Sequence, residues 1–172
     1  MKVSLAAQTL SASVADSLKY CRDTLELSQF QDSEGTEMFI RLIDHLFDLM
    51  NISSRRGRGW KGPISSENER SVTHFLETAF NTLSNITDKH HNLMIQHSRK
   101  TPFIGLCINA DSVQQLINEF VRTRRWEYLL TYKFSQDHLE LLFNCIRRTG
   151  ERNTALKCLV HEVLGTHLLF RY

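Results

Sequence analysis

The sequence predicts an all-α fold built from six to seven amphipathic helices. Apolar side chains recur at helical spacing along most of the chain, and no stretch shows the alternation expected of β-strands. The 172 residues include only two prolines and seven glycines, so few positions would interrupt a helix. At this length the chain suits one domain and can bury a substantial core.

Each expected helix follows from an apolar stripe and its flanking residues. The first runs from Val3 to about Leu27, and the second carries the strongest stripe, with Ser33 as a possible cap before it. Ser66 and Glu69 have the spacing of a capping box that opens a third helix. A short apolar segment, 101–108, is interrupted by a glycine. The remaining helices should begin at Asp111 or Ser112, after an N-cap at Ser135, and at about Asn153.

Composition limits the class of protein. The hydrophobic fraction of 41% and the charged fraction of 23% are ordinary for a soluble globular chain, and the net charge of +2 does not by itself favour nucleic acid. No apolar run reaches the length of a membrane span, and the N-terminal residues lack a signal-peptide core. The four scattered cysteines are typical of reduced thiols in an intracellular protein.

A basic, glycine-rich stretch, ISSRRGRGWKGPISS, is the one segment of low complexity. Glycine and proline predict a loop here, and the loop carries Arg55, Arg56, Arg58 and Lys61 around Trp60. Two interpretations remain open. The cations could bind a phosphate backbone while the indole stacks on a base, or the loop could be solvated with Trp60 folded back on the core.

Two groups of polar residues lie on predicted helices and have both a structural and a functional interpretation. Asp137 and Glu140 are three residues apart, so they could be a cap and a solvated residue or two oxygen ligands of Mg²⁺. Asp48 and Asn51 end the second helix and could simply be a polar terminus. Because an acid at a helix C-terminus opposes the helix dipole, Asp48 weakly indicates another use.

Five blocks, taken in order, resemble the P-element-like, THAP-type DNA transposases of animals over nearly the whole chain. The blocks are KVSLAAQTLSASVADSL, FIRLIDHLFDLMN, GRGWKGPI, RKTPFIGLCINADSVQQL and TYKFSQDHLELLFNCIRRTGERN. In that family an RNase H-like catalytic domain is interrupted by an all-helical insertion that binds GTP. The resemblance implies that residues 1–128 are most of this insertion and that residues 129–172 are C-terminal helices of the RNase H-like domain.

The resemblance also implies roles for particular residues. Glu140 matches the third catalytic acid, which helps to hold Mg²⁺, and Asp137 matches a neighbouring acid near the nucleotide and metal. Asp48 and Asn51 match the pair that reads guanine. Phe47, Lys2 and Val3 would line the same pocket.

The function implied is that of a fragment of a GTP-dependent, cut-and-paste DNA transposase. Such a protein acts on transposon ends in the nucleus, can form homo-oligomers and has no membrane segment. No residues of this chain match the two earlier catalytic acids, the zinc finger or an upstream phosphate-binding lysine, so we expect the chain to be inactive alone. The alternative is a domesticated helical interaction module that has neither nucleotide binding nor catalysis.

Overall fold

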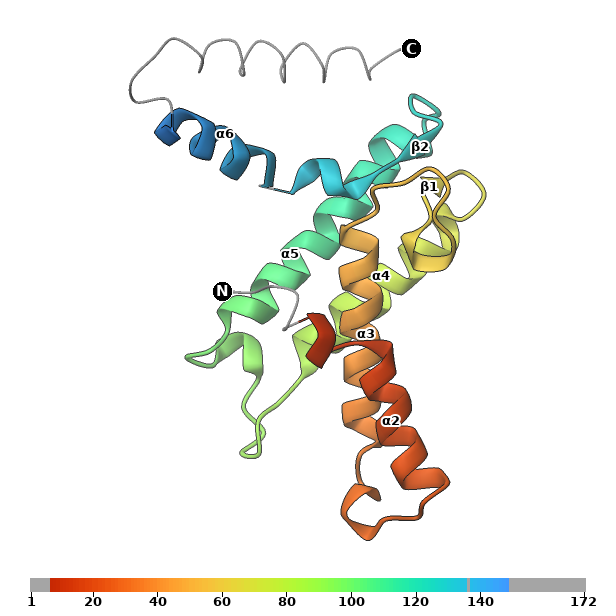
Figure 1. Ribbon diagram of the computed structural model, residues 1–172, viewed down its shortest axis with the longest axis vertical. Coiled ribbons are helices and arrows are strands. Elements are labelled where there is room, and N and C mark those ends of the chain that lie inside the picture. Colours follow the sequence, from red (N-terminus) through yellow and green to blue (C-terminus); the bar gives the residue numbers. More distant parts are fainter. Residues whose placement is uncertain (1–6, 136, 149–172) are drawn as a thin grey trace. The chain divides into compact units, whose positions relative to one another are not determined.

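The computed structural model describes residues 7–135 and 137–148, and these residues are mostly helical (Figure 1). They contain five α-helices of 12 to 17 residues and five shorter helical segments, of which one is a π-helix and the others are 3₁₀ turns. The α-helices are α2 (Ala12–Asp23), α3 (Glu34–Met50), α4 (Glu69–Asn85), α5 (Thr101–Leu116) and α6 (Asp137–Arg148). The short segments are η1 (Ser28–Phe30), η2 (Gly59–Lys61), η3 (Met94–Gln96), the π-helix η4 (Ile117–Val121) and η5 (Thr131–Phe134). The helical class is confirmed, whereas the expected helix from about Asn153 lies outside the described residues.

Two short strands correct the prediction of an all-α fold. Strand β1 (Ile64–Ser65) pairs in antiparallel fashion with β2 (Tyr128–Leu129), with Ile64 opposite Leu129. Both of these apolar residues are buried. Strands of two residues are too short to show alternation, so the sequence pattern could not have revealed them.

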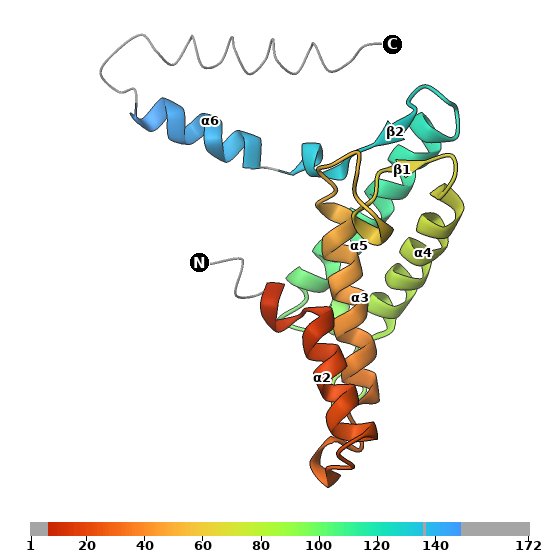
Figure 2. The same cartoon turned by 45° about the vertical axis from the view of Figure 1, so that its right-hand side comes forward.

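The chain divides into two compact units, Met1–Leu130 and Thr131–Tyr172. In the first unit, α2 packs along α3 and α4 packs along α5 (Figures 1 and 2). The core of this unit is formed by apolar residues of α3, α4, α5, η4 and the two strands, with Leu46, Leu49, Leu76, Leu83 and Ile117 among its fully buried members. The last turn of α3 is therefore fixed by the core, which gives the polar residues on its other faces defined positions.

An ion network joins α2 to α3. Glu37, which is buried, accepts hydrogen bonds from Arg22 at 2.9 Å and from Arg41 at 3.1 Å, and Arg41 also pairs with Asp16 at 2.7 Å. Burial alone would raise the pKa of the Glu37 carboxyl, but the hydrogen bonds from Arg41 and Arg22 outweigh it and hold that pKa below its usual value. The network satisfies a carboxylate that would otherwise be costly to bury.

Several predicted helix boundaries are wrong. The expected first helix is interrupted, because Ser11 is extended and α2 begins only at Ala12. Helix α4 begins at Glu69 after Asn68, not at a Ser66 capping box, since the Asn68 side chain instead holds the preceding loop through Ser65 and Pro63.

Helix α5 begins at Thr101, ten residues before the predicted start at Asp111. Pro102 in its first turn suits a helix start, because the missing N–H would have no partner there. Gly105 does not break the helix, since a helical glycine costs only about 1 kcal/mol relative to alanine. Burial of Cys107 and Ala110 on the same helix offsets that cost.

Candidate functional site

Asp48 lies in the last turn of α3 and is mostly buried. Its side chain is 21% exposed, and its Oδ1 atom is 3.4 Å from the Nζ atom of Lys61. The Lys61 side chain is 71% exposed, so this ion pair is solvated and long and contributes only about 0–1 kcal/mol. A carboxylate at this helix end is therefore weakly compensated and has acceptor capacity to spare.

Phe47 lies in the same turn, and Asn51 follows the last residue of α3, one helical turn after Phe47. The Asn51 side chain donates a hydrogen bond from Nδ2 to the Phe47 carbonyl at 2.7 Å, and the Asn51 backbone N–H donates to the Asp48 carbonyl. Asn51 thus serves as the C-terminal cap of α3, which is the structural interpretation of this residue. The Phe47 ring is 44% exposed although neighbouring Leu46 and Leu49 are fully buried.

The basic loop, residues 55–61, folds back against α3. Its tryptophan, Trp60, is partly buried and packs on the core, with ring-centroid distances of 4.3 Å to Phe75 and 5.1 Å to His45. The interpretation in which Trp60 folds back on the core is confirmed. This packing brings Lys61, in η2, to Asp48.

Lys61 and His45 are the residues of this region that the sequence analysis did not assign to the site. His45 is one helical turn before Asp48 and stacks on the Trp60 ring at an interplanar angle of 26°. A tryptophan within a polar glycine-rich loop was the available signal, since a large apolar ring in such a loop usually needs a surface to cover it. Lys2 and Val3, which were expected in the same pocket, lie outside the described residues.

Glu140 lies on α6 and is exposed. Asp137 is the first residue of the same helix, so the two acids are three residues apart as predicted. The described residues contain no group of three or more His, Cys, Asp or Glu side chains that could hold a metal ion. Glu140 can offer one carboxylate to Mg²⁺, but the described residues do not complete a metal site around it.

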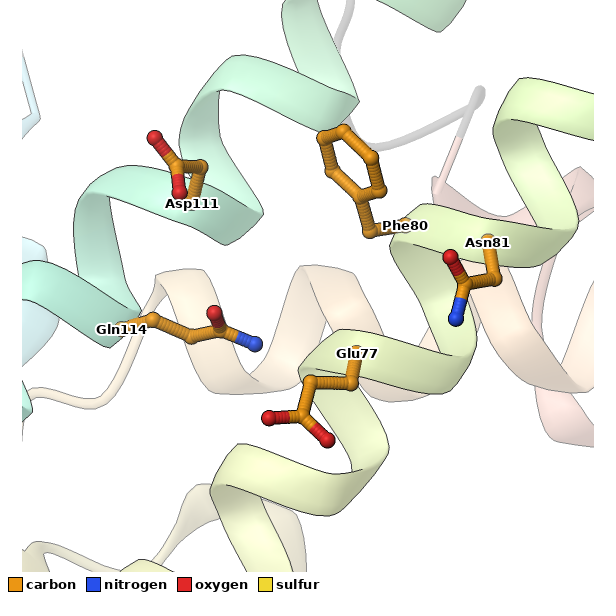
Figure 3. A pocket seen from close by; sticks show the side chains of 5 residues that line it. All are labelled: Glu77, Phe80, Asn81, Asp111 and Gln114. Carbon is orange, nitrogen blue, oxygen red and sulfur yellow. The ribbon is translucent and has the colours of Figure 1, made fainter.

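A shallow pocket of about 200 Å³ lies elsewhere, between α4 and α5 (Figure 3). It is lined by Glu77, Phe80, Asn81, Asp111 and Gln114. Figure 3 shows the first three projecting from α4 and the other two from α5. None of the residues expected to bind nucleotide or metal contributes to it, so this pocket provides no support for the expected sites.

Two family models match parts of the chain. A model described as the TNP-like GTP-binding insertion domain matches residues 1–63, and one described as the TNP-like RNase H C-terminal domain matches residues 132–155. The first range contains Phe47, Asp48, Asn51 and Lys61, and the second contains Glu140. No solved structure matches the chain significantly.

A human protein, described as DNA transposase THAP9, is 36% identical over 174 residues. The alignment covers the whole of this chain and 19% of the human protein, so the chain spans about a fifth of that relative's length. Together with the two family models, this identity shows that the chain belongs to the P-element-like transposase family. No helix within the described residues is long and apolar enough to cross a membrane.

Proposed function

We propose that the first unit is the guanine-nucleotide-binding part of a P-element-like transposase and that Asp48 reads the base. The proposal rests on the position of Asp48, a mostly buried carboxylate that has only a long contact to an exposed lysine. Its location within the match to a GTP-binding insertion domain supports this assignment. The boundary we propose for the insertion remains residues 1–128, followed by RNase H-like residues 129–172.

The chemistry of the last turn of α3 suits guanine. A carboxylate accepts hydrogen bonds, and guanine offers two donors side by side, N1–H and the N2 amino group, whereas adenine presents an acceptor at N1. The exposed ring of Phe47 offers an apolar surface beside Asp48 on which a planar base can stack. The Asn51 amide nitrogen is used by the helix cap, which leaves its side-chain oxygen as a further acceptor.

A bound guanine would compete with Lys61 for the Asp48 carboxylate. A guanine that donates both hydrogen bonds to the Asp48 carboxylate has to share that carboxylate with the Lys61 ammonium or displace the ammonium from it. Because the pair is solvated, this exchange costs on the order of 1 kcal/mol or less, about fivefold in affinity. Lys2 and Val3 complete this nucleotide site in the proposal.

Glu140 is proposed as one of the metal-binding acids of the RNase H-like part, with Asp137 beside it. In a complete site, Mg²⁺ would stabilise charge on the phosphate oxygens of the DNA during strand cleavage and joining. This chain supplies one of the three acids that such a site needs, so we derive no cleavage step from it. Contact with transposon-end DNA belongs to the same proposal and is supported by the human relative's description as a DNA transposase. Nuclear localisation and homo-oligomer formation are proposed with it from the family resemblance.

The test is a calorimetric titration of the chain with GTP and with ATP. Losing a buried hydrogen-bonded contact to the wrong base costs on the order of 1–3 kcal/mol, so GTP should bind roughly tenfold to a hundredfold more tightly than ATP. Asp48→Asn should remove much of this preference, because its amide group places a donor against a guanine donor. Asp44→Asn, one turn earlier on α3, is the matched control and should keep the preference for GTP over ATP.

A second candidate is a helical interaction module, favoured by the apolar surface of α6. Leu139 and Phe143 share one face of the helix and are each more than half exposed, and so is Leu141 on another face. An apolar surface of this kind is typical of a helix that packs on a partner. Failure of both nucleotides to bind a folded chain at millimolar concentration would favour this module, and equal binding of GTP and ATP would reduce Asp48 to a polar helix end.

A further inference from the structure

We propose that the basic loop, residues 55–61, is a preformed surface that binds the phosphodiester backbone of nucleic acid without reading its sequence. The net charge of the chain gave no reason to expect nucleic-acid binding. The reason lies in the loop's closed backbone, its exposed cations and the position of its one aromatic ring. The inference does not depend on guanine recognition by Asp48.

The loop backbone closes tightly on itself, although its composition suggests an open chain. A Cβ atom at Gly57 would lie 1.9 Å from the Lys61 carbonyl oxygen, so this close approach of backbone to backbone requires glycine. Gly59 has a φ of +58°, in the left-handed region that favours glycine. Hydrogen bonds from Lys61 to Arg58 and from Gly62 to Gly59 close the turn. These backbone contacts give the loop a defined conformation in which to meet a ligand.

The loop presents cations that are available for phosphate. Arg55, Arg56, Arg58 and Lys61 are all exposed. Within the described residues, none of the three arginines makes an ion pair with a carboxylate, whereas Lys61 pairs with Asp48. The Arg55 guanidinium lies over the Tyr128 ring at 4.3 Å, and this cation–π contact orients the group while its N–H donors stay in solvent. Guanidinium groups bind phosphate oxygens through paired hydrogen bonds.

The position of Trp60 limits how the loop can bind nucleic acid. Its ring packs against His45 and Phe75 and is only partly exposed, so it anchors the loop and is not placed to stack on a nucleobase. The remaining contacts are to phosphate, which carries no sequence information. The stacking part of the sequence interpretation is therefore replaced by anchoring, and the expected binding is electrostatic and independent of base sequence.

The test is fluorescence polarisation of two short, labelled DNA duplexes of unrelated sequence with the whole chain over a series of salt concentrations. Each phosphate neutralised contributes about −0.9 to the slope of log affinity against log salt, so three arginines contribute roughly −2.7. Changing Arg55, Arg56 and Arg58 together to glutamine should remove most of this slope. Between about 50 and about 200 mM salt, that slope is worth roughly a fortyfold change in affinity.

Two controls separate this surface from general charge and from misfolding. Lys89, Arg99 and Lys100 are exposed cations of another loop, and changing them together to glutamine removes the same charge but should leave the slope nearly unchanged. Gly57→Ala keeps every cation but forces the loop backbone apart, and it should weaken DNA binding several-fold. Gly105→Ala, where a Cβ meets nothing within 4 Å, should not. Thermal unfolding followed by circular dichroism confirms that each variant is folded.

Titration with GTP and with guanosine distinguishes DNA phosphates from nucleotide phosphates. If the arginine variant binds both duplexes as the wild type does but loses affinity for GTP relative to guanosine, the loop serves the nucleotide and the proposal is wrong. The proposal would also be wrong if the arginine variant and the variant at Lys89, Arg99 and Lys100 lost DNA affinity equally. Asp48→Asn removes a negative charge beside Lys61 and should not weaken DNA binding, so failure of guanine recognition and failure of this proposal give different results.

Discussion

Trp60→Ala should destabilise the first unit by about 2–4 kcal/mol and release the basic loop from α3. The ring makes two aromatic contacts, to Phe75 at 4.3 Å and to His45 at 5.1 Å, and such pairs contribute about 0.5–1.5 kcal/mol each beyond the area they bury. Truncation of a fully buried aromatic side chain costs about 3–5 kcal/mol, and Trp60 is only partly buried, so the value should fall below the upper end of that range.

Urea unfolding followed by circular dichroism at a helix wavelength measures this loss as a lower midpoint at an unchanged slope. Tyr20→Ala, at a side chain 55% exposed on α2, is the matched control and should shift stability by about 0.5 kcal/mol or less. A destabilisation below about 1 kcal/mol for Trp60→Ala would refute the anchoring role. Lys61 would then have no fixed position from which to pair with Asp48.

Two further predictions concern the ion network and Glu140, the proposed metal-binding acid. Because the pKa of Glu37 is lowered in the folded state, its contribution to stability is present above its ordinary pKa of 4.5 and is lost as pH falls through the folded value. Glu37→Gln should therefore make thermal stability less dependent on pH below about pH 5, whereas Glu34→Gln, at an exposed position of the same helix, should not. The purified chain with Mg²⁺ or Mn²⁺ should neither nick nor join supercoiled DNA, because one acid cannot hold the metal ions of phosphoryl transfer. Metal-dependent cleavage that disappears in Glu140→Ala would contradict this expectation.

The sequence predicted the interiors of α3 and α4 and the start of α3 after Ser33, but not the start of α4. Apolar residues three and four apart fix the buried face, and Leu46, Leu49, Leu76 and Leu83 are all fully buried. The starts depend on a few local hydrogen bonds that several nearby residues can supply. At α4, Asn68 makes these bonds to the loop, and Ser66 is left outside the helix.

The early start of α5 differs from the sequence prediction because Gly105 interrupts the apolar pattern without breaking the helix. Gly105 costs the helix little, while the segment around it gains by burying Cys107 and packing Phe103 and Leu106 on the core. Asp111, the predicted helix start, is exposed in the helix interior, where its side chain accepts a hydrogen bond from Gln115. An acid followed by apolar residues gives the same sequence pattern at a helix start and in a helix interior.

The proposed nucleotide site could be predicted from the sequence only in part, and for a physical reason. The helix positions of Phe47, Asp48 and Asn51 follow from the period of α3, but the approach of Lys61 depends on how a glycine-rich loop returns to the helix. That return is set by the Trp60 packing and by the contact between Gly57 and Lys61, which are tertiary features. A sequence pattern shows that such a loop is present but not which residues it contacts.

Asp48 carries the nucleotide hypothesis because it is the residue in the last turn of α3 that local helix energetics do not explain. Asn51 caps the helix, and its place there is fully accounted for by the hydrogen bond to Phe47. An acid at the same end opposes the helix dipole, loses hydration through burial and receives only a weak ion pair in return. A locally unfavourable residue held in place by a buried core is expected where a ligand supplies the missing interaction. A ligand with two adjacent N–H donors would supply it, and guanine has this arrangement whereas adenine does not.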